Sequence, residues 1–481
     1  MAGTGFETRL FINGEYVDAK TQSRLTCYNP IDNSVVTSDV HVALKDDVND
    51  AVVAARRAFP GWAAASAVTK SKAMLRVADL IEEHAEAFAR LESICSGKPF
   101  VSTTGYEAAM AANTFRYYAG FTDKLEGESF PPDNGFMRVV QREPIGVCAA
   151  INAFNGPLIM LANKSAPCLA AGNTIIIKAS EKTPLSTLFF GKLANEAGFP
   201  AGTVNLICGG AETGALLASH MDIDKISFTG SGTTGKKIAQ AAAASNLKRV
   251  TLELGGKSPS IIFPDAHMDV AVNWCVQGIT ANTGQACIAS SRVYVHRDIK
   301  QQFIDRIRTV FEGLHMAMGK DVFDQGTQIG PLVDKAHFDR VSSFVAHGKQ
   351  EATLVTGGQA LYDQGCWFTP TLFIDPYPDA KIYKEEIFGP VVVVSEFEDE
   401  RDVIQRANNT TFGLSGAVFS QDINRALRVA SQIRSGTVCV NCCTMIDYTV
   451  PFGGMKQSGW GRELGKDGIL AYTEPKTMFI K

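Results

Sequence analysis

The chain has 481 residues and a formal net charge of −4, from 46 Lys and Arg against 50 Asp and Glu. This length predicts two or three lobes, and the slight acidity argues against nucleic acid or an anionic membrane as a partner. No apolar run is long enough to span a membrane. The N-terminal residues have neither the basic start nor the apolar core of a signal peptide, so we expect a cytoplasmic protein.

The first 142 residues predict extended pieces and amphipathic helices, followed by a polar arm. Leu10–Ile12 is predicted to be extended. Apolar residues at helical spacing predict helices over 48–59, 73–91 and 108–120. The segment 126–142 is polar and interrupted by Pro131 and Pro132, which indicates an arm between lobes rather than part of a core.

From residue 145 onwards, short strands rich in β-branched residues alternate with helices. Strands are predicted over 147–152, 174–178, 203–207 and 225–228, and helices over 185–197, 213–220 and 234–244. This alternation is typical of an α/β fold with a doubly wound parallel sheet, whose ligands bind beyond the carboxyl ends of the strands. A further strand over 260–263 and a helix over 268–280 begin a second lobe.

A glycine motif follows one of these strands. Gly230, Gly232 and Gly235 satisfy the pattern G-x-G-x-x-G at the start of a predicted helix, whose N-terminus would receive a pyrophosphate. A strict Rossmann arrangement also needs an acid about twenty residues later, and Glu253 lies near that distance. Glu253 also ends a predicted strand, where a carboxylate can act as a general base. From the motif alone, Glu253 could be the acid that binds the ribose, a general base, or a solvated loop acid.

The eleven cysteines are scattered through the chain, which favours reduced thiols over a disulfide framework. Cys287 lies among small and polar residues, with Gly284 nearby. It is therefore either a small buried hydrophobe or a nucleophile. Cys439, Cys442 and Cys443 lack a second pair of ligands at zinc spacing, so we expect a strand end there and no metal.

Motifs spread over nearly the whole chain resemble those of the aldehyde dehydrogenase superfamily, in its NAD(P)-dependent, non-acylating form. They lie at 153–157 (AFNGP), 178–181 (KASE), 228–231 (FTGS), 252–257 (LELGGK), 284–287 (GQAC), 385–390 (EEIFGP) and 451–459 (PFGGMKQSG). The order and spacing of these motifs make the resemblance specific.

The resemblance implies an α/β protein of three parts. These are a Rossmann-like doubly wound NAD-binding domain over 1–123 and 145–254, an α/β catalytic domain over 255–463, and a small β oligomerisation arm over 124–144 and 464–481. Because members of this superfamily are dimers or tetramers, a homodimer or homotetramer is expected.

The resemblance also implies roles for three residues. Cys287 matches the nucleophile that attacks an aldehyde and forms a thiohemiacetal, then a thioester. The side-chain amide of Asn155 and the backbone N–H of Cys287 would bind the oxyanion. Glu253 matches the base that activates water to hydrolyse the thioester, which favours the general-base role over the ribose-binding role. The implied reaction is the NAD-dependent oxidation of an aldehyde to a carboxylic acid.

The cofactor residues implied by the resemblance come from both lobes. They are Lys178, Ser180, Glu181, Gly230, Ser231, Gly235, Glu386 and Phe388. A carboxylate such as that of Glu181 accepts hydrogen bonds from both ribose hydroxyls but repels a 2′-phosphate, so NAD is expected rather than NADP.

Several positions of the expected substrate tunnel depart from the common aromatic pattern. Phe154 replaces the usual Trp, Gly156 stands where Phe is usual in enzymes of aliphatic aldehydes, and Asn163 stands where Trp is common. The full expected lining is Phe154, Gly156, Met160, Asn163, Ile288, Cys443, Ile446 and Phe452. The loss of ring volume predicts a wider, more polar tunnel. The Asn-Gly-Pro step at 155–157 and the Lys-Ala-Ser-Glu step at 178–181 resemble the branch that acts on aryl aldehydes such as salicylaldehyde or vanillin. Gly156 could instead reflect repacking alone.

Three other functions compete with this interpretation. A semialdehyde dehydrogenase that transfers its acyl group to coenzyme A would not need the base at Glu253. A thiol hydrolase would need a histidine, and none lies near Cys287 in the sequence. A catalytically silent binding or structural relative would not need Asn155, Glu253 and Cys287 together.

Overall fold

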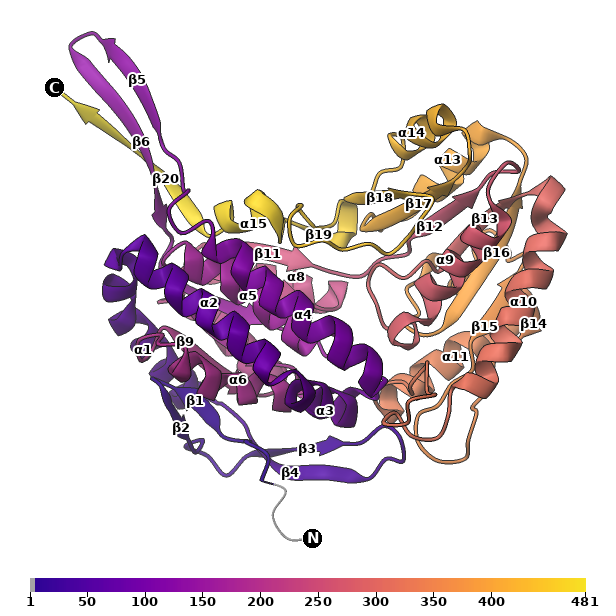
Figure 1. Cartoon of the computed structure of the whole chain (residues 1–481), viewed down its shortest axis with the longest axis horizontal. Coiled ribbons are helices and arrows are strands. Elements are labelled where there is room, and N and C mark those ends of the chain that lie inside the picture. Colours follow the sequence, from indigo (N-terminus) through magenta and orange to yellow (C-terminus); the bar gives the residue numbers. More distant parts are fainter. Residues whose placement is uncertain (1–4) are drawn as a thin grey trace.

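The computed structural model describes residues 5–481, in two α/β lobes with a projecting β-sheet (Figure 1). The first four residues, part of the N-terminal stretch judged not to be a signal peptide, lie outside this range. Within the described range, no helix is both long and apolar enough to cross a membrane.

The first lobe is built on an eight-stranded sheet in the order β19-β11-β10-β7-β8-β9-β1-β2. The five central strands, from β11 to β9, run parallel, whereas β19, β1 and β2 are antiparallel additions. Their bounds are β1 Leu10–Ile12, β2 Glu15–Val17, β7 Val147–Ile151, β8 Thr174–Ala179, β9 Val204–Cys208, β10 Lys225–Thr229, β11 Arg249–Glu253 and β19 Gly459–Trp460. The predicted doubly wound α/β sheet is confirmed.

Helices cover both faces of this sheet, which explains why its central strands are apolar on both sides. Along β7, Cys148 and Ala150 pack with α2, α4, α5 and α6, while Val147 and Ala149 pack with α1, α7 and α8. The bounds are α1 Lys45–Ala64, α2 Ala67–Glu83, α3 Ala85–Ser96, α4 Phe100–Ala119, α5 Pro157–Ala170, α6 Leu185–Glu196, α7 Ala211–Ser219 and α8 Gly232–Ser245. A separate antiparallel pair is formed by β3 Arg24–Tyr28 and β4 Val35–His41.

The prediction of one continuous helix over 73–91 is wrong, because two helices, α2 and α3, share this range. His84 ends α2 and precedes α3 with a non-helical φ of −109° and ψ of 19°. Its Nδ1 donates to the Leu80 carbonyl at 3.0 Å, and its ring packs edge-on against Phe189 at 5.8 Å. Because Phe189 lies on α6, the second of these contacts fixes the break between α2 and α3 against that helix.

The second lobe has a seven-stranded sheet in the order β14-β15-β16-β13-β12-β17-β18, in which β14 alone is antiparallel. The strands are β12 Pro259–Ile262, β13 Arg292–His296, β14 Thr353–Thr356, β15 Thr371–Ile374, β16 Val391–Phe397, β17 Ser415–Phe419 and β18 Thr437–Val440. Its helices are α9 Met268–Thr280, α10 Lys300–Ala317, α11 Lys335–Glu351, α12 Lys381–Lys384, α13 Glu400–Asn408 and α14 Ile423–Ala430, whereas α15 Gly465–Leu470 packs on α5 of the first lobe. Cys439 lies in β18 near its end, as predicted.

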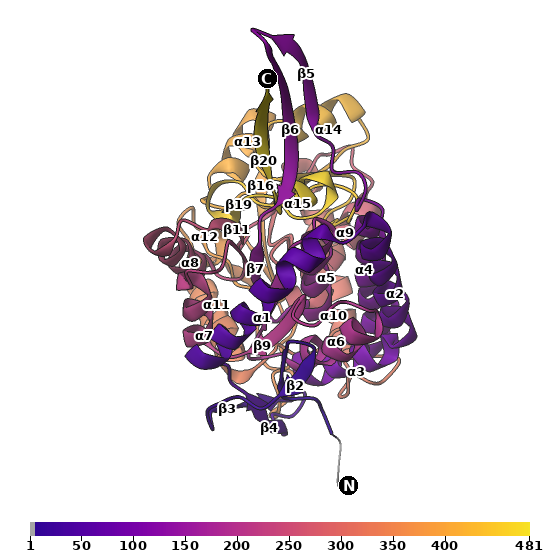
Figure 2. The same cartoon turned by 90° about the vertical axis from the view of Figure 1, so that its left-hand side faces the viewer.

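The segment predicted to be an arm forms a sheet of β5 Glu128–Asp133, β6 Phe136–Pro144 and β20 Thr473–Ile480, in the order β20-β6-β5. Both views show it projecting beyond the lobes (Figures 1 and 2). Pro131 and Pro132 lie in β5, an edge strand whose register shifts between Phe130 and Asp133. An edge strand tolerates proline because one side of it needs no N–H donors.

Candidate functional site

A cavity of about 520 Å³ lies at the carboxyl ends of β7, β8, β10 and β11, and residues of the second lobe close its other side. The chain runs from β7 outwards to β8 and β9, then returns to β10 on the opposite side of β7. Ligands of doubly wound sheets bind at such a change of direction. Cys287, Glu253 and Asn155, predicted from distant motifs, all line this cavity.

Asn155 lies in the loop between β7 and α5 and is bound to the segment that precedes Cys287. Its Nδ2 donates to the Gln285 carbonyl at 2.9 Å, and its own carbonyl accepts Nδ2 of Asn282 at 3.0 Å. Asn282 and Thr283 have positive φ values of 49° and 56°, which turn the chain back towards α5. The Asn155 amide therefore lies beside the backbone that carries the cysteine.

Cys287 is half-buried behind this turn. A Cβ on Gly256 would lie 2.1 Å from the Cys287 carbonyl oxygen, so only glycine allows this approach. Burial of the sulfur, together with the carboxylates of Glu386 and Glu253, raises the pKa of the thiol to about 12. The backbone N–H groups of Cys287 and Ile288 act in the opposite direction. Without a bound cation the thiol is therefore protonated at neutral pH.

Glu253 is the last residue of β11 and is 3% exposed. Among the described residues, neither of its carboxyl oxygens has a hydrogen-bond partner. Burial, with a smaller contribution from the Glu463 carboxylate, raises the pKa of Glu253 well above its usual 4.5. A carboxylate with a raised pKa and free lone pairs is suited to accept a proton from water.

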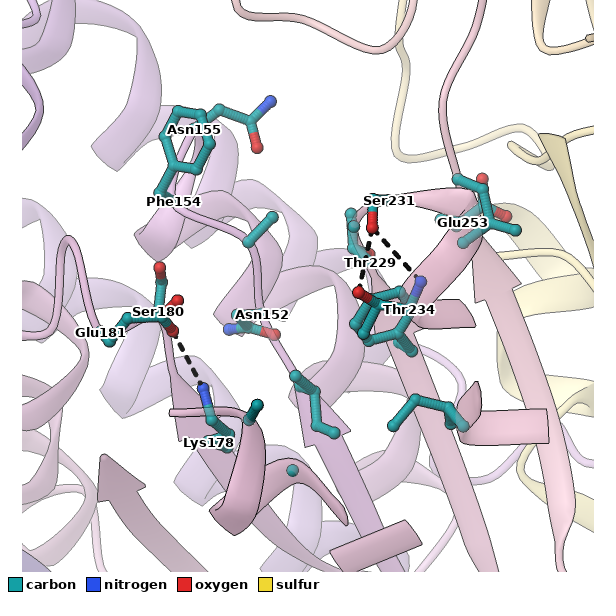
Figure 3. A pocket seen from close by; sticks show the side chains of 18 of the residues that line it. Asn152, Phe154, Asn155, Lys178, Ser180, Glu181, Thr229, Ser231, Thr234 and Glu253 are labelled. Atoms are coloured by element: carbon teal, nitrogen blue, oxygen red, sulfur yellow. Dashed lines mark hydrogen bonds and ion pairs between the residues drawn. The ribbon is translucent and has the colours of Figure 1, made fainter. Parts of the chain in front are cut away.

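Residues at and just after the ends of β8 and β10 line part of the cavity (Figure 3). Lys178 donates to the Ala179 carbonyl at 3.0 Å and lies 3.4 Å from Oε2 of Glu181. Ser231 caps α8 by accepting the N–H of Thr234 at 3.3 Å. The exposed backbone N–H groups and the dipole at this helix start favour an anion. Ser180 and Gly230 also line the cavity.

Gly235 does not line the cavity. It lies in α8, where a Cβ would be 2.6 Å from Cδ2 of Leu254. Its small size lets the helix pack closely on the end of β11, so its contribution to the site is indirect.

The second lobe contributes Glu386 and Phe388, and α11 holds both in place. Oε1 of Glu386 accepts the N–H of Gly256 at 2.9 Å, and burial raises the pKa of this carboxyl. Arg340 donates to the Glu386 carbonyl at 2.7 Å, and Nε2 of His337 donates to the Phe388 carbonyl at 2.7 Å. Phe388 has a positive φ of 63°, which these bonds stabilise. Burial lowers the pKa of His337 to about 4, so its ring is neutral.

His337, Arg340 and Asn152 are among the lining residues that sequence reasoning missed. His337 and Arg340 lie on an ordinary amphipathic helix, which gives no signal of a site. Asn152 directly follows β7, a position that the rule for carboxyl ends could have identified. Both amide atoms of Asn152 are buried without a partner among the described residues, so they are available to a ligand that fills the cavity.

Most of the expected tunnel residues lie either in an apolar cluster or along α5. Ile288, Phe452 and Ile446 form an apolar cluster beside Cys287. On α5, the nearest atom to a Cβ placed on Gly156 is Cε of Met160, at 3.9 Å, so the site of the missing ring is open.

Asn163 follows on α5, buried, and its Oδ1 has no partner among the described residues. Two further residues lie elsewhere. Cys443 donates to the Trp274 carbonyl at 3.1 Å under α9, and Phe154 packs edge-on against Phe388 and His337.

A protein-family model described as the aldehyde dehydrogenase family matches residues 16–478 of the chain. The chain is 44% identical over 475 residues to an aldehyde dehydrogenase from Emericella nidulans, which covers 98% of the chain and 95% of that protein. It is also 44% identical over 479 residues to retinal dehydrogenase 2 from Homo sapiens, covering 98% and 92%.

Solved structures agree with these relatives. An aldehyde dehydrogenase from Burkholderia cenocepacia superimposes with a TM-score of 0.96 at 40% identity, covering 99% of this chain and 98% of that one. An NAD⁺ complex of an aldehyde dehydrogenase from Bacillus cereus superimposes with a TM-score of 0.95 at 41% identity, covering 98% and 96%.

Proposed function

Because the chain belongs to the aldehyde dehydrogenase family and is an NAD-dependent aldehyde oxidoreductase, we propose that Cys287, Asn155 and Glu253 carry out its reaction. The observation that supports this assignment is their convergence on one cavity from the loop after α9, the loop after β7 and the end of β11. A catalytically silent relative would have no need of this convergence.

The first step is attack of Sγ of Cys287 on the aldehyde carbon, which forms a thiohemiacetal. The oxygen of that adduct gains negative charge, and Nδ2 of Asn155 and the N–H of Cys287 stabilise it. In the structure Nδ2 of Asn155 donates to the Gln285 carbonyl, two residues before the nucleophile.

The second half of the reaction removes the acyl group. NAD, when bound, supplies the acceptor for the hydride that leaves the substrate carbon, and a thioester remains on Cys287. Glu253 then takes a proton from water, which attacks the thioester and releases the carboxylic acid. Burial makes Glu253 a stronger base than an exposed carboxylate.

The cavity suits a dinucleotide. We assign the adenosine ribose to Lys178 and Glu181, the pyrophosphate to the start of α8, and the nicotinamide ribose to Glu386 beside Phe388. The unpartnered amide of Asn152 supports a ligand rich in hydrogen-bonding groups.

The substrate we propose is an aromatic or otherwise bulky aldehyde. The open space at Gly156 and the apolar cluster of Ile288, Ile446 and Phe452 beside Cys287 support a substrate with a ring. The buried, unpartnered Oδ1 of Asn163 supports a ring that carries a hydroxyl donor.

The division into domains is also part of the proposal. The NAD-binding domain comprises 1–123 and 145–254, and it gains the strand β19 from the range 255–463 of the catalytic domain. The exposed side chains Phe136 and Phe479 on the projecting sheet pair at 6.4 Å. They support oligomerisation through 124–144 and 464–481, as a homodimer or homotetramer.

Two rate measurements test the proposal. NADH absorbance during turnover should be lost in Cys287→Ala, and full activity of that variant would exclude the mechanism. A panel of aldehydes with NAD should favour benzaldehyde and hydroxybenzaldehydes over acetaldehyde. Equal kcat/KM on acetaldehyde and benzaldehyde would exclude the widened tunnel but not the chemistry.

A further inference from the structure

Helix α5 begins just after Asn155 and has no cap of its own. Its N-cap residue is Gly156, which has no side chain, and its first residue is Pro157, which has no N–H. The first backbone donor of the helix is therefore the N–H of Leu158. Most helices satisfy such donors with a nearby Ser, Thr, Asp or Asn.

A buried carboxylate from another helix supplies the missing cap. Oε1 of Glu92, on α3, accepts the N–H of Leu158 at 2.8 Å and the hydroxyl of Ser186, on α6, at 3.2 Å. Glu92 is 1% exposed, and its charge lies at the positive end of the α5 dipole. One carboxylate thus joins three helices at the start of the helix that follows Asn155.

Lys98 keeps Glu92 ionised. Its Nζ donates to Oε2 of Glu92 at 3.1 Å and to Oε1 of Glu107 at 2.6 Å. Burial alone would raise the pKa of Glu92, but the Lys98 ammonium and the N–H of Leu158 lower it below its usual value. Burial and the neighbouring Glu92 raise the pKa of Glu107 well above its usual value. One ammonium therefore lies between two carboxyl groups, and Glu92 holds the negative charge in preference to Glu107.

We propose that Glu92 is a positioning residue for Asn155, because it fixes the first turn of α5 and so directs the Asn155 amide towards Cys287. This inference rests on the proposed role of Asn155 in binding the oxyanion. The other side of Asn155 is fixed by Asn282, whose amide bonds to the Asn155 carbonyl. A misplacement of about 1 Å at such a donor can cost about 100-fold in rate.

The variant Glu92→Gln tests the cap with little change of shape. An amide has one acceptor oxygen and no charge, so the variant either leaves the N–H of Leu158 without its cap or keeps that bond without the negative charge at the start of α5 and without the bond to Lys98. Glu107 can ionise to remain paired with Lys98, so the variant is expected to fold. We expect kcat to fall about tenfold, within the effect of losing an oxyanion donor, with the KM for NAD unchanged. Glu86→Gln, at the exposed surface of the same helix, is the matched control and should keep the wild-type kcat.

A double-mutant cycle separates positioning from a general structural effect. Asn155→Ala should lose about 10²–10³ in kcat, and adding Glu92→Gln should cause no further loss. Losses that multiply, or a wild-type kcat in Glu92→Gln, would overturn the inference. A wild-type kcat in Asn155→Ala would instead overturn the proposed function.

If Glu92→Gln does not fold, Ser186→Ala replaces it, because it removes one hydrogen bond from the same oxygen. It should lower kcat about twofold, and only when Asn155 is present. An unchanged kcat, or an equal loss in the Asn155→Ala background, would overturn the inference.

Discussion

The reactivity of Cys287 should depend strongly on whether NAD is bound. In the NAD-free protein, burial and the carboxylates of Glu386 and Glu253 raise the pKa of this thiol to about 12. At pH 8 roughly one thiol in 10⁴ is then ionised, because the ionised fraction changes tenfold per pH unit. A positive charge within about 4–6 Å lowers a pKa by roughly 1–3. The nicotinamide cation should therefore speed alkylation of Cys287 by about 10- to 1,000-fold.

Alkylation by iodoacetamide, followed by peptide mass spectrometry, measures this effect with and without NAD. Cys442, the other half-buried cysteine of the described chain, serves as the internal control, and its rate should not change with NAD. In the NAD-free protein the rate at Cys287 should rise about tenfold per pH unit between pH 7 and pH 9. A rate at Cys287 that NAD leaves unchanged or slows would refute the electrostatic reasoning.

Three further results are expected. Glu253 acts as a base in its ionised form, and burial raises its pKa well above 4.5. We therefore expect kcat to fall as the pH is lowered through that raised pKa. A fall in kcat only at or below pH 4.5 would contradict the role of Glu253. Arg340→Ala removes two hydrogen bonds to the loop of Glu386 and should raise the KM for NAD about tenfold, with partial recovery in Arg340→Lys. An unchanged KM would show that the loop keeps its conformation without these bonds. Gly156→Phe should lower kcat/KM on benzaldehyde about 10- to 100-fold, and kcat/KM on acetaldehyde should fall less. Equal losses of kcat/KM on both aldehydes would point to misfolding of the loop.

The parallel sheet could be predicted because its central strands are buried on both faces. Strands such as Val147–Ile151 and Thr174–Ala179 are short and apolar, and helices flank them. The break at His84 could not be predicted, because the apolar spacing continues across it. That break depends on a ring contact with Phe189, a residue more than one hundred positions away in the sequence.

The site residues that lie in sequence motifs could be predicted, whereas those that act through tertiary contacts could not. Cys287, Glu253 and Asn155 lie in motifs with a recognisable order. His337 and Arg340 act through carbonyl groups of a loop about fifty residues away, and their own helix shows only ordinary amphipathic spacing. Glu92 is similar: its partner Leu158 is 66 residues away, and nothing in the sequence around Glu92 indicates a cap for another helix.

The most direct test of the mechanism is the mass of Glu253→Gln after it is mixed with NAD and an aldehyde. This variant retains the nucleophile and the oxyanion donor of Asn155 but lacks the base that removes the acyl group. We expect one acyl group per chain, located on the peptide of Cys287, with NADH formed in equal amount. Formation of NADH without an acyl adduct, or an adduct on another residue, would contradict the mechanism.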